Sequence, residues 1–208
     1  MARRYRDHHR LKTLLTHECA RLMAEEGIKD FGVAKRKAAL RLGVSDKAAL
    51  PDNLQIQQAL IDYQQFFNAA SHETHLRTLR KTALEAMHFL ARFRPKLVGA
   101  VLVGTAGPHA DIQLHLFAHT PEDVLMFLMD HGIPLESGTR RLKSSNGVYV
   151  SIPMYRFTAD DIGIELAVFG LLDERESPRS PVDGRPLRRA NSSEVRELLD
   201  ANLAKSIL

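Results

Sequence analysis

Polar and apolar side chains alternate along the segment 111–118, whose sequence is DIQLHLFA. In an extended strand, residues two apart point to the same face, so Asp111, Gln113 and His115 share one face. The bases of such side chains lie about 6–7 Å apart, so their tips can converge on one cation. The residues of the opposite face are apolar and are expected in the core: Ile112, Leu114 and Leu116.

A second carboxylate interrupts another apolar segment, because Glu165 lies in the middle of IGIELAVF at 162–169. An acid among apolar neighbours is unfavourable unless it is paired, binds a metal or faces a cleft. If the segment 161–169 lies beside 111–118, Glu165 joins the face that carries Asp111. Two carboxylates are the protein ligands that Mg²⁺ commonly uses, with phosphate oxygens supplying others.

The apolar run 97–104 ends in Gly104-Thr105, and we expect it to be a strand. A strand ending in Gly-Thr, then an acid that opens the next strand, then an acid on a later strand resembles the nucleotidyltransferase superfamily. The resemblance covers about residues 97–170. It implies that Asp111 and Glu165 are catalytic metal ligands, and that Gly104 and Thr105 position phosphate through close backbone approach. Gln113 stands where the family has its second Asp, as a weak ligand or a donor to phosphate.

The same resemblance implies a nucleoside triphosphate as substrate and Mg²⁺, or Mn²⁺, as cofactor. Because Gln113 is neutral, we expect one weakly held ion, or none in the absence of nucleotide. The predicted activity is transfer of a nucleotidyl group to an RNA, a protein or a small acceptor. The alternative is a catalytically degenerate module that binds RNA, a ribosome-like particle or a partner protein, so whether the chain is an enzyme stays open.

Two groups of basic residues could contact phosphate. Guanidinium groups suit phosphate through their forked donors, so the loop 173–191 is a candidate nucleotide contact, or else a solvated tether. The basic segment 31–42 is a candidate for contact with a nucleic-acid backbone, or else a solvated helix face. The loop residues are Arg185, Arg188 and Arg189, and those of the basic segment are Lys35, Arg36, Lys37 and Arg41.

Composition indicates a soluble globular protein, with 44% hydrophobic and 26% charged residues among 208. Residues 1–97 hold 18 Lys and Arg against 10 Asp and Glu, whereas residues 98–208 hold 11 against 15. A basic first half could meet a polyanion. The single cysteine, the lack of an apolar N-terminal segment and the lack of a long apolar run predict a cytoplasmic protein that does not enter a membrane.

The period of the apolar residues changes near residue 96 from helical to extended. We therefore expect an α+β protein, with a basic helical module at 1–95 and a nucleotidyltransferase-like mixed sheet flanked by helices at 96–208. The expected helices are 7–26, 31–42, 54–69, 71–92, 121–131 and 192–205. The expected strands are 97–104, 111–118, 147–157 and 161–169.

Overall fold

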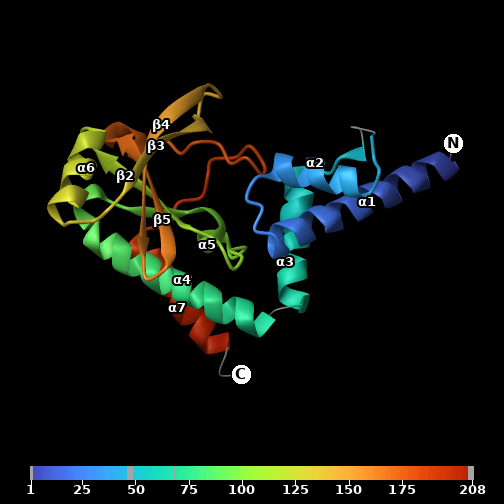
Figure 1. Cartoon of the computed structure of the whole chain (residues 1–208), viewed down its shortest axis with the longest axis horizontal. Helices are drawn as coiled ribbons and strands as arrows, with labels where there is room; N and C mark the ends of the chain where they lie inside the picture. Colours follow the sequence, from blue (N-terminus) through green and yellow to red (C-terminus); the bar gives the residue numbers. More distant parts are fainter. Residues whose placement is uncertain (1, 46–48, 68, 206–208) are drawn as a thin grey trace. The chain divides into compact units, whose positions relative to one another are not determined.

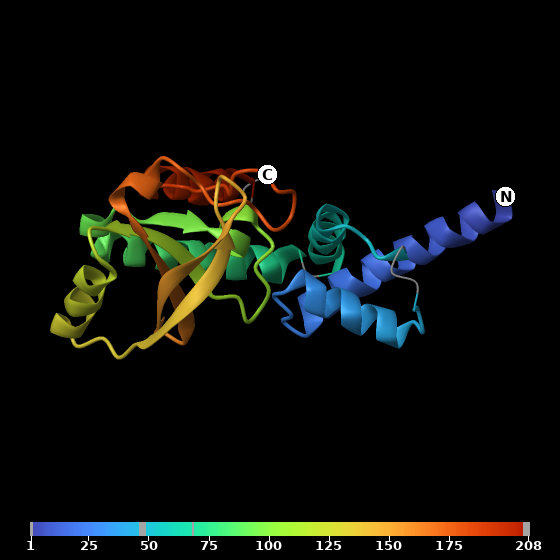
Figure 2. The same ribbon diagram turned by 90° about the horizontal axis from the view of Figure 1, so that it is seen from above.

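The computed structural model describes residues 2–45, 49–67 and 69–205, and the chain folds into two compact units (Figures 1 and 2). Unit 1 comprises residues 1–73 with the short pieces 107–109 and 181–183. Unit 2 comprises residues 74–106, 110–180 and 184–208. The predicted boundary near residue 95 differs from this division, because most of the helix that precedes it belongs with the sheet of unit 2.

Among its described residues, unit 1 contains the helices α1 (Ala2–Glu25), α2 (Phe31–Arg41) and α3 (Asn53–Phe67). Asp30 caps α2 by accepting a hydrogen bond from the backbone N–H of Val33 at 2.8 Å. Burial raises the pKa of the Cys19 thiol to about 11, so this cysteine is a neutral core residue at physiological pH. The larger buried cluster of unit 1 is Leu15, Cys19, Leu22, Ala34, Ala38, Ala49 and Ile56, and a smaller one is Ala20, Ala59 and Leu60.

Unit 2 is built on a five-stranded mixed sheet in the order β1-β2-β5-β4-β3. Strands β2 and β5 are parallel, and the other neighbours are antiparallel. The strands are β1 (Lys96–Val98), β2 (Ile112–Ala118), β3 (Glu136–Lys143), β4 (Tyr149–Ala159) and β5 (Ile162–Gly170). The helices are α4 (Ala69–Phe89), whose first residues belong to unit 1, η2 (Ala91–Phe93), α5 (Gly99–Val103), α6 (Pro121–Asp130), η3 (Leu171–Glu174) and α7 (Ser192–Lys205).

The two faces of the sheet differ in chemistry. Leu114 and Leu166 point to the face that α4, α6 and α7 cover with apolar side chains (Figure 1). Their neighbours in sequence point to the other face, where polar groups lie near one end and a small apolar cluster lies near the other. That small cluster is formed by Phe117, Ala167 and Phe169, with partly buried Leu142, Ile152, Met154 and Leu171.

The structure confirms the expected α+β class, with a helical N-terminal part and a mixed sheet. The expected strand 97–104 is wrong, since only 96–98 is strand and 99–103 is the helix α5. Gly99 adopts φ +71°, which ends the extended conformation, and Val101 and Leu102 then enter the core as a helical pair. A short apolar run fits a buried helix as well as a strand, which is why the pattern misled.

Strand β3 has no counterpart among the expected strands. Its sequence ESGTRRLK is polar, and most of its side chains are exposed because it lies at the edge of the sheet. Edge strands commonly carry charges, so their sequences lack the apolar alternation that marks a strand. Within the described parts of the chain, no helix is long and apolar enough to cross a membrane.

Candidate functional site

The parallel pairing of β2 with β5 brings the predicted acid-bearing segments together. Gln113 lies directly opposite Glu165 in this register, and Asp111 immediately precedes β2 on the same side as Gln113. Two arginines from β3 and β4 reach this end of the face. We call Asp111, Gln113, Arg140, Arg156 and Glu165 the acid–arginine cluster.

Two glycines make room for the cluster. A Cβ atom added to Gly163 would overlap the carboxylate of Asp111, and one added to Gly99 would overlap the amide oxygen of Gln113. Gly99 also has φ +71°, a conformation that side-chain-bearing residues rarely adopt. The glycine that follows the first strand and contacts the site is therefore Gly99, and not Gly104 as the sequence suggested.

Glu165 is held by two donors from neighbouring strands. The amide Nε2 of Gln113 donates to Glu165 Oε2 at 3.0 Å, and Arg140 Nη1 donates to the same oxygen at 3.3 Å. The Glu165 side chain is 14% exposed, whereas that of Arg140 is 40% exposed. The acid is thus fixed in the sheet, while the arginine reaches it from solvent.

Asp111 has a similar arrangement with a different arginine. Arg156 Nη2 lies 3.3 Å from Asp111 Oδ1 and 3.5 Å from Oδ2. The side chain of Asp111 is 8% exposed and that of Arg156 is 50% exposed. Arg156 enters because β4 places it directly opposite Glu165. Sequence reasoning missed both arginines, since neither lies in a recognisable motif.

The cluster combines two carboxylates with two guanidinium groups, so its formal charge is balanced. Carboxylate and amide oxygens are the ligands that Mg²⁺ prefers, and Asp111 and Glu165 could supply two of them. Among the described residues, no group of three or more His, Cys, Asp or Glu is arranged to hold a metal. The donor chemistry therefore fits one cation that takes most of its ligands from elsewhere, such as phosphate oxygens and water.

Gly104 and Thr105 lie at the end of α5 rather than at the end of a strand. Gly104 is the C-cap of α5, with φ +93°, and a Cβ atom there would contact Leu76 and the Arg80 guanidinium of α4. Arg80 is buried and donates to the carbonyl oxygens of Val101 and Leu102 at the same helix end. Because α4 covers the apolar face of the sheet, Gly104 is placed with the helix layer and not with the acid–arginine cluster.

Arg189 clamps the 171–191 segment to the sheet. Its Nε donates to His115 Nδ1 at 3.1 Å, and its Nη1 donates to three carbonyl oxygens, those of Asp173, Glu174 and Glu176. The guanidinium also lies 5.0 Å from the ring centroid of Phe117 and 5.1 Å from that of Phe169. These contacts give Arg189 a structural role in holding the segment to the sheet. The other two predicted loop arginines, Arg185 and Arg188, have exposed side chains.

His115 is a buried acceptor beside the cluster. Burial, assisted by the charges of Arg189 and Arg140, lowers its pKa to about 3. Its Nδ1 accepts from Arg189, so the neutral ring carries its proton on Nε2. A histidine with this pKa is not a general acid or base at neutral pH, and its role in unit 2 is to anchor the 171–191 segment.

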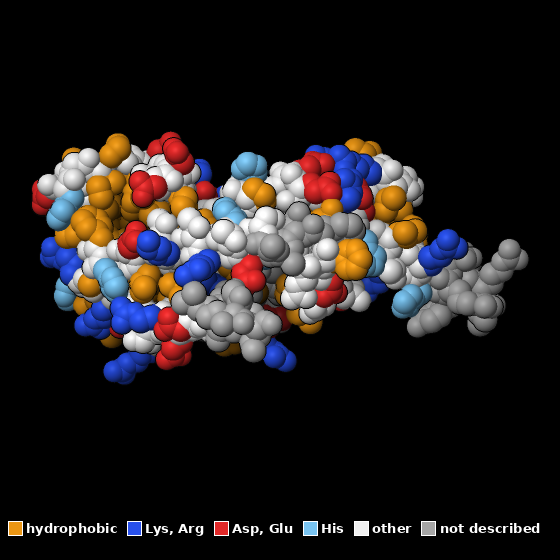
Figure 3. All heavy atoms as spheres, turned by 90° about the horizontal axis from the view of Figure 1, so that it is seen from below, with side chains coloured by type: hydrophobic (Ala, Val, Ile, Leu, Met, Phe, Trp, Pro, Cys, Tyr) orange, Lys and Arg blue, Asp and Glu red, His pale blue; other side chains and the backbone are white. Residues whose placement is uncertain are grey.

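The basic residues of α2 are partly neutralised within unit 1. Lys37 pairs with Glu26, and Arg41 pairs with Glu26 at 2.8 Å and with Glu18 at 3.3 Å. Figure 3 shows acidic and basic side chains in contact on this unit. The hydrogen bond from Lys37 is the largest influence on the pKa of Glu26 and lowers it. Burial, the next largest, raises this pKa, and Arg41 lowers it further. Of the four predicted phosphate-contacting residues, two therefore have acidic partners, and Lys35 is half-buried and Arg36 exposed.

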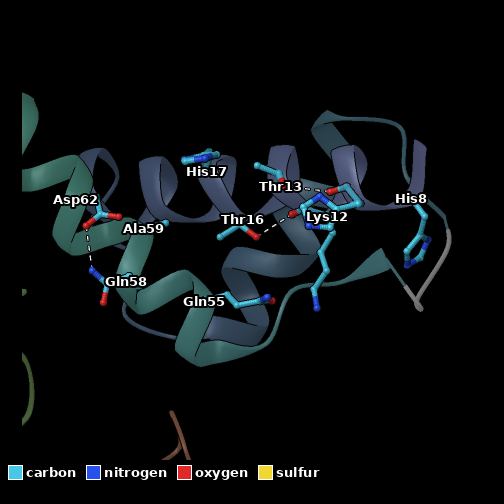
Figure 4. A pocket seen from close by; sticks show the side chains of 10 residues that line it. His8, Lys12, Thr13, Thr16, His17, Gln55, Gln58, Ala59 and Asp62 are labelled. Carbon is cyan, nitrogen blue, oxygen red and sulfur yellow. Dashed lines mark hydrogen bonds between the residues drawn. The ribbon is translucent and has the colours of Figure 1, made fainter. Parts of the chain in front are cut away.

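A polar groove lies between α1 and α3 in unit 1, with a volume of about 540 Å³ (Figure 4). Lys12 and Gln55 come from opposite sides of it, and Gln58 donates to Asp62 on one wall at 3.0 Å. The residues of α1 fall on two rows with a spacing of four, which a helical wheel of the sequence could have shown. The α1 residues are His8, His9, Lys12, Thr13, Thr16 and His17.

Comparison with known proteins adds no relative: no family model, curated protein or solved structure matches this chain.

Proposed function

We propose that unit 2 is a nucleotidyltransferase-like module that binds a nucleoside triphosphate with one divalent cation at the acid–arginine cluster. The observation that carries the proposal is the placement of Asp111 and Glu165 on the same sheet face, at adjoining parallel strands. Each acid is largely buried and each has an arginine beside it, so the cluster offers anionic and cationic groups together. A metal–triphosphate complex carries the complementary pair of charges.

In this proposal Asp111 and Glu165 would hold Mg²⁺ or Mn²⁺, and Arg140 and Arg156 would bind phosphate oxygens. A bound cation supplies charge neutralisation at the phosphates and lowers the pKa of a nearby hydroxyl. The acceptor hydroxyl would release its proton to solvent water as its oxygen forms a bond to the α-phosphorus, the bond from that phosphorus to the bridging oxygen would break, and pyrophosphate would leave. Arginines fixed near the departing phosphates stabilise the charge that develops on them. Gln113 holds Glu165 in place through its amide donor.

The test is calorimetric titration of ATP, GTP, CTP and UTP into the full chain, with and without Mn²⁺. We expect binding of at least one triphosphate that requires the cation and that Asp111→Asn weakens by tenfold or more. Asp130→Asn, an exposed acid at the end of α6, is the matched control and should bind like the wild type. Absence of cation-dependent binding for all four nucleotides would contradict the proposal.

A second candidate, a catalytically degenerate module that binds RNA, is favoured by two observations. Gln113 gives the cluster a neutral amide where a charged ligand would strengthen a metal site. The groove between α1 and α3 offers Lys12, three histidines and several neutral donors to a phosphate backbone. Binding of single-stranded RNA without nucleotide or metal, with an affinity that falls steeply with salt, would favour this candidate over the first.

A further inference from the structure

We propose that Arg140 and Arg156 are exchangeable counter-ions that keep the acid–arginine cluster closed to a free metal ion and open it to a metal–triphosphate complex. In the ligand-free protein they neutralise Glu165 and Asp111. On binding they transfer to the phosphates and leave both acids to the cation. This inference depends on the proposed function and specifies how the same site is regulated.

The difference in burial within each pair identifies the partner that moves. Asp111 and Glu165 are 8% and 14% exposed and are attached to the paired central strands β2 and β5. Glu165 is also fixed by Gln113. The two arginine side chains are 40% and 50% exposed, and an arginine has four rotatable bonds with which to turn toward solvent. The acids therefore stay in place while the arginines can leave.

The weak geometry of the pairs supports exchange. Each pair has one guanidinium nitrogen at 3.3 Å, which is longer than a strong charge-assisted hydrogen bond. Phosphate oxygens offer the same guanidinium a forked, doubly hydrogen-bonded contact. Only the arginine of each pair is half-exposed, and the cation that arrives with the phosphate replaces it as the counter-ion of the buried acid, so the exchange leaves no buried charge unpaired.

The same arginines oppose a cation that arrives alone. A metal at Asp111 or Glu165 would meet a guanidinium within about 4 Å of the carboxylate, and like charges at that distance repel. If an arginine is removed, its carboxylate loses its counter-ion and becomes a better ligand. If the triphosphate is present, its phosphate oxygens bind the guanidinium, and the repulsion between that guanidinium and the metal ion is removed. Metal affinity in the wild type is therefore coupled to nucleotide.

The variants are Arg140→Ala, Arg156→Ala and the double variant, with Arg140→Lys as a charge-preserving comparison. Arg141→Ala is the matched control, because Arg141 is the next residue of β3 and faces the opposite side, 5.4 Å from the Tyr149 ring centroid. Two quantities are measured on the full chain of 208 residues: the Kd of Mn²⁺ alone and the Kd of ATP at saturating Mn²⁺. Thermal melting followed by circular dichroism shows that each variant is folded.

We expect the double variant to bind Mn²⁺ alone about tenfold more tightly than the wild type and to bind ATP about tenfold more weakly. Arg140→Lys should lie between the wild type and Arg140→Ala in both measurements, and Arg141→Ala should match the wild type. The exchange is identified by opposite changes in the two affinities, tighter for Mn²⁺ and weaker for ATP, because a merely structural defect would weaken the binding of both. If the double variant does not fold, the single variants must show the same opposite shifts at smaller size.

Two results would overturn the inference, and they can be told apart from failure of the proposed function. If ATP binds with Mn²⁺ and needs Asp111, but Mn²⁺ affinity is unchanged in the arginine variants, the function stands and the exchange is wrong. If the two affinities fall together in those variants, the exchange is also wrong. If neither the wild type nor any variant binds a nucleotide, the proposed function fails and the inference fails with it.

Discussion

At the scale of single residues, the amide of Gln113 determines how many charges the cluster holds. Its nitrogen donates to Glu165, and its oxygen lies where any side chain at position 99 would be. A carboxylate at position 113 could not donate this hydrogen bond. The amide therefore lets two acids, and not three, coexist with two arginines in the ligand-free protein.

We expect Gln113→Asp to destabilise the metal-free protein by about 2 kcal/mol, because it removes a hydrogen bond to a charged group and adds a like charge beside Glu165. The same change should raise Mn²⁺ affinity at least about tenfold, or about 1.4 kcal/mol. Titration of Mn²⁺ and denaturant melts of both proteins measure these effects. Gln113→Ala is the control, since it should lose stability without gaining metal affinity. Unchanged metal binding in Gln113→Asp would show that position 113 does not face the metal.

His115 gives the protein a dependence of stability on pH. Its pKa in the folded protein is about 3, whereas an unfolded histidine titrates near 6.5, so the unfolded state binds more protons between these values. Stability from this residue is complete above about pH 6.5 and is lost as the pH falls toward 3. We expect the wild type to lose on the order of 2 kcal/mol more than His115→Gln between pH 6.5 and 4.5.

Denaturant unfolding of both proteins at half-unit steps of pH measures this difference. A glutamine oxygen can still accept from Arg189, so His115→Gln should remain folded at neutral pH. His119→Gln, at an exposed position, controls for the loss of one imidazole. Parallel stability curves for the wild type and His115→Gln would contradict the prediction.

At the scale of elements, the sequence predicts those that carry a local signal. Thr120 and Pro121 mark the start of α6, where Thr120 and Asp123 form a capping box. Alternation marks β2, and a short apolar run marks β5. Strand β3 is defined by pairing with β4 and not by its own residues. Arg140 belongs to this strand, so this member of the acid–arginine cluster could not be predicted. Pairing between β2 and β5 is likewise non-local. The sequence could therefore predict that Glu165 and Asp111 share a face only if these two strands are neighbours.

Unit 1 provides a prediction at the same scale, which compares the α1–α3 groove with the basic helix α2. Lys12→Ala should weaken binding of single-stranded RNA and lower the slope of log affinity against log salt by about 0.7, the value for one lost phosphate contact. Lys37→Ala should change neither, because Lys37 already pairs with Glu26. Fluorescence anisotropy at four salt concentrations measures both. If Lys37→Ala weakens RNA binding more than Lys12→Ala does, the RNA contacts lie on α2 and not in the α1–α3 groove.

At the scale of the whole molecule, the charge division seen in the sequence does not coincide with the two units. Residues 1–73 hold 12 Lys and Arg against 9 Asp and Glu, so most of the excess of +8 over residues 1–97 comes from α4 and the segment after it. Those residues belong with the sheet. Net charge therefore gives unit 1 little attraction for a polyanion, and any RNA binding there depends on the local groove.

The buried residues of unit 1 and unit 2 form separate clusters: Leu22 belongs to a cluster of unit 1, and Leu114 to the large cluster of unit 2. Because each truncation leaves a cavity in one core, Leu22→Ala and Leu114→Ala should each lower the stability of its own unit by about 2–5 kcal/mol. We expect Leu22→Ala to leave triphosphate binding at the acid–arginine cluster unchanged, and Leu114→Ala to weaken it by moving β2. Hydrogen exchange of the full chain, read separately for residues 11–42 and 112–118, measures the stability of each unit. If Leu22→Ala increases exchange in β2 as much as in α1, the two cores unfold as one cooperative unit and the division proposed for function does not hold.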